Sequence, residues 1–477
     1  MRGPGEGSDV ATTPAVPAHP ATGPGPHSGQ SGQNAVHRGA TRKAMARLLP
    51  VLCLAYFMSY VDRTNIALAK THLEADVGIS VAAFGLGAGL FFITYACLEI
   101  PSNLVMYRVG PRRWIARIAI SWGLVTALMV FVNGDISFYV LRMALGAAEA
   151  GLYPAMMFMI TQWFHQRDRG VAVGYIYVAG AAGMFLGSPL SGALLELQDV
   201  GGLHGWQWMF LIEGVVTVVV GVLVLVLLPN RAHDARWLTT AEADALQHAA
   251  TGEDAAHERH SLRGNLATAF GRPFIVLIGV IYFLNQVSAN GVGLNVPSII
   301  EDMDIDSSFV IGVLSGITGL GGLIGVLVIP RLARRMSNEI TLLGALAAAC
   351  AVASLLFLAT GSPVMRIVLI GVLGFLMIGT LPTIWSVAMP RMTGLMAAAG
   401  LAFINTVGMF GGFVGPFAFG QIETHSGTPV TGFWLVCAVS VIGAALTVPL
   451  VGAVRRADRD LAAETGATRN DKENHRE

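Results

Sequence analysis

The sequence predicts an all-α membrane protein with twelve transmembrane helices in two pseudo-symmetric six-helix halves. The first indication is composition, since 54% of the 477 residues are hydrophobic and 13% are charged, against about 25% charged in a typical soluble domain. The second is a series of apolar runs of about 20 residues, each long enough to cross a ~30 Å hydrocarbon core. The third is an internal repeat: the spacing of Gly183 and Gly187 in the fifth run reappears as Gly411 and Gly415 in the eleventh. A duplicated six-helix unit is typical of transporters, whose substrate site lies between the halves.

The expected spans form two sets of six around one long polar break. They lie near residues 47–69, 82–106, 114–133, 137–160, 170–195 and 206–228, and then near 273–299, 309–330, 338–360, 364–389, 395–421 and 429–453. The predicted organisation is a disordered N-terminal tail (1–43), a first six-helix half (44–228), a central loop (229–272), a second half (273–453) and a C-terminal tail (454–477). The tails hold too few large apolar residues to offset the entropy of ordering. In the loop, Thr239 and Glu242 form a capping-box pattern that predicts a short surface helix.

Basic residues gather on one side of this topology and predict its orientation. The loops on that side hold Arg108, Arg112, Arg113, Arg167, Arg169, Arg331, Arg334 and Arg335. The loops on the opposite side are acidic and hold Glu74, Asp76, Glu196, Asp199, Glu301, Asp302, Asp304 and Asp306. Because arginine and lysine are retained on the cytoplasmic side, both termini and the central loop are predicted to face the cytoplasm.

Charge balance, cysteines and motifs exclude several classes of function. The 30 basic residues equal the 30 acidic residues in number, so we expect no nucleic-acid partner. The four cysteines stand far apart in apolar runs, which argues against a disulfide framework or a metal site. The sequence shows no nucleophile elbow, metal triad or phosphate-binding loop. We therefore expect no enzyme activity, no cofactor and no metal.

Four ionisable residues stand inside expected spans of the first half. Asp62 and Arg63 are neighbours in the first span, while Arg142 and Glu149 lie on one face of the fourth, two turns apart. The opposite directions of these spans place the two arginines at a similar depth. Ionisable residues are costly in a bilayer, and two guanidinium groups at one depth suit a carboxylate ligand. The alternative is a buried ion-pair network that only holds the helices together.

The second half is expected to have no charged residue deep in any span. Its candidates for hydrogen bonds to a substrate are Asn285, Gln286, Asn290, Trp385 and Asn405. Helix–helix hydrogen bonding is the alternative role for the amides among them. Two further acids of the first half, Glu99 and Glu213, lie within expected spans. Glu99 is equally compatible with orienting the adjacent loop and with moving protons.

Several segments resemble the major facilitator superfamily and, within it, the anion:cation symporter family. They are Tyr60-Val-Asp-Arg-Thr-Asn-Ile66, Glu99-Ile-Pro-Ser-Asn103, Ala148-Glu-Ala-Gly-Leu-Tyr-Pro154, Gly205-Trp-Gln-Trp-Met-Phe-Leu-Ile-Glu-Gly214 and Gly411-Gly-Phe-Val-Gly-Pro416. The family includes carriers of hexonates, tartrate, phthalate and hydroxyphenylacetate. A departure is Tyr107, which stands where the superfamily usually has an acid.

The resemblance implies proton-coupled import of a small organic anion by alternating access. It implies that Arg63 and Arg142 bind the carboxylate of the substrate, and that Asp62 and Glu149 carry the coupling proton. The expected partners are the anion, protons and the lipid bilayer, and the expected state is a monomer in the inner or plasma membrane. Sugar acids, aromatic acids and dicarboxylates all stay open as substrates. The alternatives are a proton-driven exporter or antiporter, and a transporter-like sensor that binds a substrate without moving it.

Overall fold

The computed structural model describes residues 26–251, 272–336, 338–392 and 394–474, and this part of the chain is all-α. Within it, 12 segments are long and apolar enough to cross a membrane, which confirms the predicted fold class. The first half contains α1 (Pro26–Leu68), α3 (Val81–Val109), α4 (Pro111–Leu128), α5 (Asp135–Glu149), α6 (Leu152–Trp163), α7 (Gln166–Leu195) and α8 (Gly205–Leu227). The second half contains α11 (Pro273–Glu301), α12 (Ser308–Ala333), α13 (Glu339–Ala359), α14 (Pro363–Gly379), α15 (Leu381–Ala388), α16 (Gly394–Ser426) and α17 (Phe433–Asn474). Shorter elements are α2 (Lys70–Val77), α9 (Thr240–Thr251) and the 3₁₀ turns Met129–Phe131, Ala232–Asp234, Met389–Arg391 and Pro429–Gly432.

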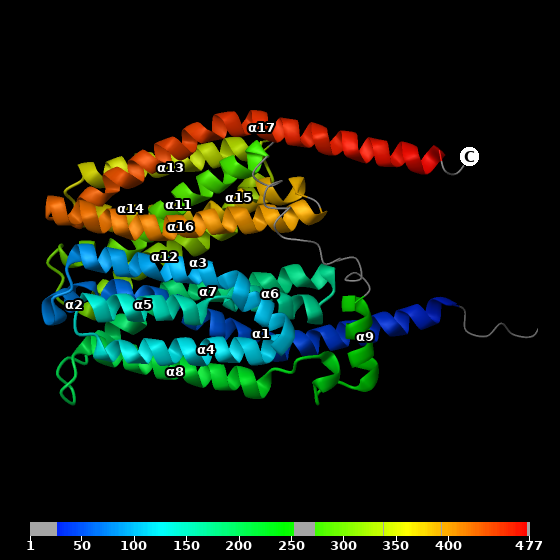
Figure 1. Ribbon diagram of the computed structural model, residues 1–477, viewed down its shortest axis with the longest axis horizontal. Helices are drawn as coiled ribbons and strands as arrows, with labels where there is room; N and C mark the ends of the chain where they lie inside the picture. Colours follow the sequence, from blue (N-terminus) through cyan, green and yellow to red (C-terminus); the bar gives the residue numbers. More distant parts are fainter. Residues whose placement is uncertain (1–25, 252–271, 337, 393, 475–477) are drawn as a thin grey trace, which may run out of the picture.

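The two halves lie side by side, the first in the lower part of Figure 1 and the second in the upper part. They meet where α7 packs on α12 and α3 packs on α16. We call the end of the bundle that carries α9, the start of α1 and the end of α17 the tail end, and the opposite end, with α2, the far end (Figure 1).

The seam between the halves is tightest toward the far end. A Cβ atom on Gly85 of α3 would lie 2.6 Å from the carbonyl oxygen of Pro416, and one on Gly312 of α12 would lie 2.4 Å from that of Ser188. Side chains are excluded from such contacts, so the glycines let the helix backbones touch. Toward the tail end of α7, a Cβ on Gly174 would meet nothing within 4 Å. The helix backbones of the two halves are therefore in direct contact at the far end, whereas Gly174 is exposed.

The fourth span is broken into α5 and α6 rather than continuous. Gly151 joins them with a φ of 91°, a left-handed conformation that only glycine adopts without strain. The hydroxyl of Ser102 donates a hydrogen bond of 2.7 Å to the carbonyl of Ala150, which satisfies an acceptor that the break removes from the helix. The break makes Glu149 the last residue of α5. The tenth span is also divided, between α14 and α15 at Thr380, but there the backbone keeps right-handed helical dihedrals, with a φ of −71° and a ψ of −27°.

Replacing Gly151 with alanine is expected to lower the melting temperature of the purified protein markedly. The new Cβ would lie 2.3 Å from the Ser102 oxygen in a backbone conformation with positive φ, and we expect a cost of about 2 kcal/mol or more from strain and overpacking. Gly174→Ala on α7 is the matched control, because a Cβ there meets nothing within 4 Å. Equal melting temperatures for the two variants would contradict this account of the break.

The helices at the tail end extend into segments that were expected to be disordered. Residues 26–43 belong to α1, and α17 continues through residues 454–474. Ala40 is fully buried on α1, and Asp458 of α17 pairs with Arg391 at 2.8 Å. These contacts stabilise helical turns whose composition alone would not order them. Residues 1–25 and 475–477 lie outside the described residues.

The short helix predicted in the central loop is confirmed as α9. The Thr239 hydroxyl accepts a hydrogen bond from the amide of Glu242 at 3.3 Å, and the Glu242 carboxylate accepts one from the amide of Thr239 at 3.0 Å. This reciprocal pair is the capping box expected from the sequence. Glu242 also binds Lys43 of α1 at 2.7 Å, so the helix is fastened to the first half. Residues 252–271 of the loop lie outside the described part of the chain.

Candidate functional site

Arg63 and Glu149 form an ion pair in the interior of the first half. The Nη2 atom of Arg63 lies 2.8 Å from Oε1 of Glu149. The Glu149 side chain is 1% exposed, whereas that of Arg63 is 31% exposed although it stands in a membrane span. The other carboxylate oxygen of Glu149 and the Nε of Arg63 are buried without a hydrogen-bond partner. Each residue of the pair thus has one polar atom that is free to form a further hydrogen bond.

Arg142 lies in the same cluster but is bonded differently. It is 5% exposed, and its Nε has no hydrogen-bond partner. Among the described residues no carboxylate approaches it within ion-pair distance, although it interacts electrostatically with both Asp62 and Glu149. A buried guanidinium without a direct partner is costly, and such a group is suited to bind an anion.

Aromatic rings hold the two guanidinium groups in place. The guanidinium of Arg63 lies 5.3 Å from the ring centre of Tyr60, 5.9 Å from that of Phe91 and 5.8 Å from that of Tyr95. That of Arg142 lies 5.0 Å from the same Phe91 ring. Phe91 therefore contacts both cations, and cation–π attraction fixes them against one apolar wall. The two guanidinium groups therefore lie beside one another at the same ring.

Asp62 turns away from Arg63 into a separate polar cluster. Its Oδ1 accepts hydrogen bonds from Thr126 at 2.7 Å and from Asn65 at 3.4 Å. Asn65 also donates to Glu213 at 2.7 Å, and Glu213 accepts from Ser191 at 2.7 Å. Consecutive helix residues point about 100° apart, which is why neighbours in sequence serve different clusters. The structure brings Glu149, and not Asp62, into contact with Arg63.

The neutral candidate residues of the second half do not form one cluster, and each contacts a different partner. Asn405 donates a hydrogen bond of 3.1 Å across the seam to Glu99. Asn285 donates to the Met377 carbonyl at 3.1 Å, while its own oxygen is buried without a partner.

The remaining three candidates make contacts within their own half. Asn290 bonds the Gln286 carbonyl of its own helix at 3.0 Å, Gln286 packs close to Gly411, and Trp385 meets the Tyr282 ring edge-on at 5.6 Å. Of the five candidates, only Asn405 is hydrogen-bonded to a residue of the first half.

A set of tyrosines between the halves was missed by the sequence analysis. The hydroxyls of Tyr153 and Tyr177 lie 2.9 Å apart, and Tyr56 and Tyr60 pack edge-on at 5.2 Å. Tyr282 of the second half interacts electrostatically with Tyr60. Tyr56 and Tyr60 are four residues apart, one turn before Arg63, and this spacing could have placed them on the same face. These rings give the site both apolar surface and hydroxyl groups.

One charged residue of the second half was also missed. Glu423 lies in α16, within the span Gly400–Ser426, whereas the predicted span ended at residue 421. The helix runs about one turn further because the carboxylate has a buried partner, Lys70 of α2, at 2.6 Å. Glu423 stands in the last turn of this span, so it lies at the end of the helix and not deep within it. Among the described residues no group of three His, Cys, Asp or Glu side chains is placed to hold a metal ion.

Comparison with protein families and curated proteins places this architecture among known transporters. The family model described as the Major Facilitator Superfamily matches residues 52–416. A putative tartrate transporter of Agrobacterium vitis is 36% identical over 86% of this chain and 90% of its own length. A quinolone resistance transporter of Acinetobacter baumannii is 36% identical over 85% and 93%, and the inner membrane transport protein RhmT of Escherichia coli is 34% identical over 84% and 93%.

Solved structures show the same fold at low sequence identity. A bacterial homologue of the lysosomal transporter Spinster, in an inward-facing and unoccupied conformation, matches with a TM-score of 0.66 at 16% identity, covering 86% of this chain and 96% of that one. A D-xylose–proton symporter matches with a TM-score of 0.65 at 16% identity, covering 84% and 97%.

Proposed function

This chain belongs to the major facilitator superfamily of membrane transporters, and from that premise we propose that it is a proton-coupled symporter for a small organic anion. It is a multi-pass carrier and not an enzyme. The observation that supports an anionic substrate is the pair of guanidinium groups on Phe91, of which only Arg63 has a carboxylate in contact. Relatives named as tartrate transporters agree with this class of substrate.

Charge balance supports coupling to protons. Arg63 and Arg142 are offset by Glu149 and Asp62, so the cluster is neutral when all four are ionised. An added substrate carboxylate would leave one uncompensated negative charge in a medium of low dielectric, which is strongly unfavourable. One proton bound together with the anion restores neutrality. The geometry favours Glu149 as its acceptor, because this residue shares Arg63 with the incoming carboxylate.

The helix break places Glu149 where its charge depends on its partner, which is either Arg63 or a proton. The residue ends α5, where the helix carboxyl end carries partial negative charge and repels a second negative group. While it is bound to Arg63 this repulsion is offset. When the substrate takes the guanidinium, ionised Glu149 loses its partner, and a proton then neutralises it. Asp62, held by Thr126 and Asn65, would serve as a second site for protons, further from the substrate.

The polar groups of the second half and the tyrosines would complete the substrate site. Asn285, Gln286, Asn290, Trp385 and Asn405 offer hydrogen bonds and an aromatic surface opposite the arginines. Asn405 already contacts Glu99 of the first half, so closure of the two halves around a substrate would rearrange this bond. We propose that the protein works as a monomer, because each chain holds both halves of the site.

The direct test is uptake by purified protein in proteoliposomes. A panel of radiolabelled sugar acids, aromatic acids and dicarboxylates is offered with and without an inward proton gradient. The proposal requires concentrative uptake of at least one carboxylate that collapses when the gradient is dissipated. Accumulation driven by an outward proton gradient would favour the exporter, and saturable binding with no uptake of any bound anion would favour the sensor.

Orientation can be tested with single cysteines at the two ends. We propose that the tail end faces the cytoplasm, because its loops hold the arginine clusters at residues 108–113, 167–169 and 331–335. In a background without native cysteines, Asp306→Cys at the far end should react with a membrane-impermeant maleimide on intact cells. Ala241→Cys on α9 should react only after lysis, and both positions are exposed in the structure. The reverse pattern would contradict this topology.

A further inference from the structure

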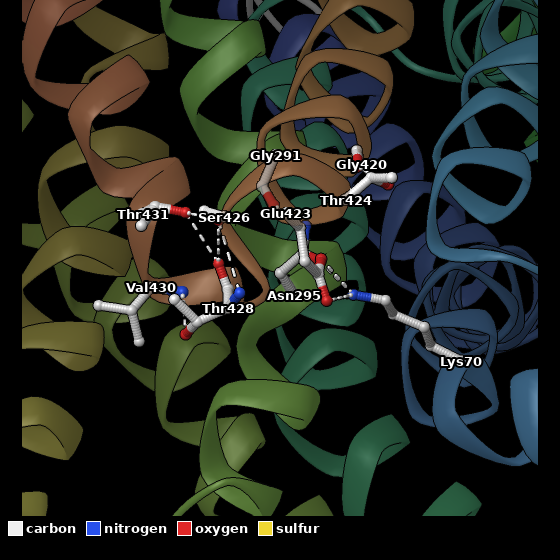
Figure 2. Close-up of polar contacts among 10 residues, drawn as sticks. All are labelled: Lys70, Gly291, Asn295, Gly420, Glu423, Thr424, Ser426, Thr428, Val430 and Thr431. Atoms are coloured by element: carbon white, nitrogen blue, oxygen red, sulfur yellow. Dashed lines mark hydrogen bonds and ion pairs between the residues drawn. The ribbon is translucent and has the colours of Figure 1, made fainter.

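A buried lysine joins the two halves at the far end. Lys70, the first residue of α2, is 3% exposed. Its ammonium donates to both carboxylate oxygens of Glu423, at 2.8 and 2.6 Å, and to the Asn295 side-chain oxygen at 2.8 Å. Figure 2 shows Lys70 reaching from the first half to these two residues on α16 and α11. An ammonium has three donors, and all three are given to groups of the other half.

The surroundings of this contact leave little room for water. A cavity of about 10 Å³ adjoins it, lined among others by Phe84, Gly85, Leu294 and Pro416, which is room for about one water molecule. The cavity lies at the tight seam, where Gly85 touches the backbone of Pro416 and Gly420. The side chains of Lys70 and Glu423 are 3% and 11% exposed, so full hydration of both ions requires α2 and α3 to move away from α16.

A second link crosses the same end of the bundle. Glu196, just after α7, accepts hydrogen bonds from the Phe309 amide at 3.1 Å and the Ser307 hydroxyl at 2.9 Å, at the start of α12. These donors hold the pKa of the Glu196 carboxyl below its ordinary value. A lowered pKa means that this contact favours the closed far end while Glu196 is ionised, and that it is lost only as the pH falls through that lowered value. At neutral pH this second link is therefore intact.

Charged groups suit a contact that must open and close repeatedly. A buried ion pair gains Coulomb attraction but gives up the hydration of both ions, and the two terms nearly cancel. When the seam opens, each ion regains its water, so the open form is not penalised as an exposed apolar seam would be. Removing only one partner leaves a buried charge alone, which favours opening. Such a contact keeps the open and closed forms of the seam close in free energy. The ratio of their populations is then sensitive to each residue of the contact.

We propose that Lys70, Glu423 and Asn295 form a latch that holds the far end of the transporter closed and sets the ratio of its two access states. The latch depends on the proposed function in one respect: substrate is taken to enter from the far end. Each cycle then requires the ammonium to leave Glu423 and Asn295 and to return to them. The strength of this contact limits how often the arginine site is open to the far side.

The test measures opening of the seam without any substrate. Leu294 is 8% exposed and lines the cavity beside Lys70, so Leu294→Cys in a background without native cysteines reports when water and a small maleimide reach it. With purified protein in detergent, Glu423→Gln and Lys70→Met are each expected to raise the labelling rate at least about tenfold, because each leaves one buried charge without its partner. Asn295→Ala removes one of three bonds and should raise the rate less. The exchange Lys70→Glu with Glu423→Lys should return it toward the parent value.

Glu242→Gln is the matched control, because it breaks the ion pair with Lys43 at the tail end and should leave the labelling rate unchanged. An unchanged rate in folded Glu423→Gln, with a melting temperature near that of the parent, would overturn the latch. If that variant does not fold, an unchanged rate in Asn295→Ala overturns it instead. Because labelling requires neither anion nor protons, faster labelling in a protein that transports no carboxylate would keep the latch and refute only the proposed function.

Discussion

Replacing Arg142 with alanine is expected to reduce the affinity for the transported anion by roughly ten- to a hundredfold. The guanidinium is buried and has no carboxylate in contact, so a bound anion would supply its charge-assisted hydrogen bonds, worth about 1.5–3 kcal/mol. Arg63→Ala should have an effect of similar size and should also leave Glu149 unpaired. Lysine at either position should restore only part of the affinity, because it loses the planar fork of donors. Substrate-induced stabilisation against heating, measured over a range of anion concentrations, gives the dissociation constants.

Arg366→Ala is a suitable control for this substitution. Arg366 also lies over an aromatic ring, 5.6 Å from the centre of Phe357, but it stands in α14, away from the site. Its loss should leave the anion affinity at the parent value while removing a comparable cation–π contact. Well-folded Arg142→Ala protein with parent-like affinity would show that the anion binds elsewhere.

Glu149→Gln is expected to abolish accumulation driven by a proton gradient while leaving exchange of anion for anion. Glutamine resembles the protonated acid, so the site keeps its shape and Arg63 remains available to the substrate. Counterflow requires no net proton movement and should persist. Asp62→Asn should weaken the pH dependence less, because its hydrogen bonds from Thr126 and Asn65 hold it away from Arg63. The measurements are uptake with and without a proton gradient, and counterflow at fixed pH.

Glu339→Gln is the matched control for the coupling experiment. Glu339 accepts a hydrogen bond from Ser386 at 3.1 Å in the second half and has no contact with either arginine. Its uptake and counterflow should equal those of the parent. Full concentrative uptake by the Glu149→Gln protein would show that the coupling proton is carried by another group.

The fold class, the number of spans and the charges deep in the spans of the first half could all be predicted from the sequence. Transfer of a side chain into a bilayer depends mainly on that side chain, so runs of apolar residues identify spans without knowledge of their neighbours. A charge within an apolar run is likewise evident from the sequence alone. For this reason the sequence identified Asp62, Arg63, Arg142 and Glu149 as candidates. The capping box at Thr239 was found for the same reason, because its two hydrogen bonds join residues three apart.

Which of these charges contact one another follows from the packing of the helices and could not be predicted from the sequence. Asp62 and Arg63 are adjacent in sequence, yet the turn of the helix sends one to Thr126 and the other to Glu149. Lys70 and Glu423 both stand at the ends of spans, where a charge is unremarkable, and 353 residues separate them. Their contact depends on how the two halves pack, a relation between distant surfaces that no local pattern records. The sequence thus specifies which groups are costly to bury, and the packing of the halves determines which partner offsets each cost.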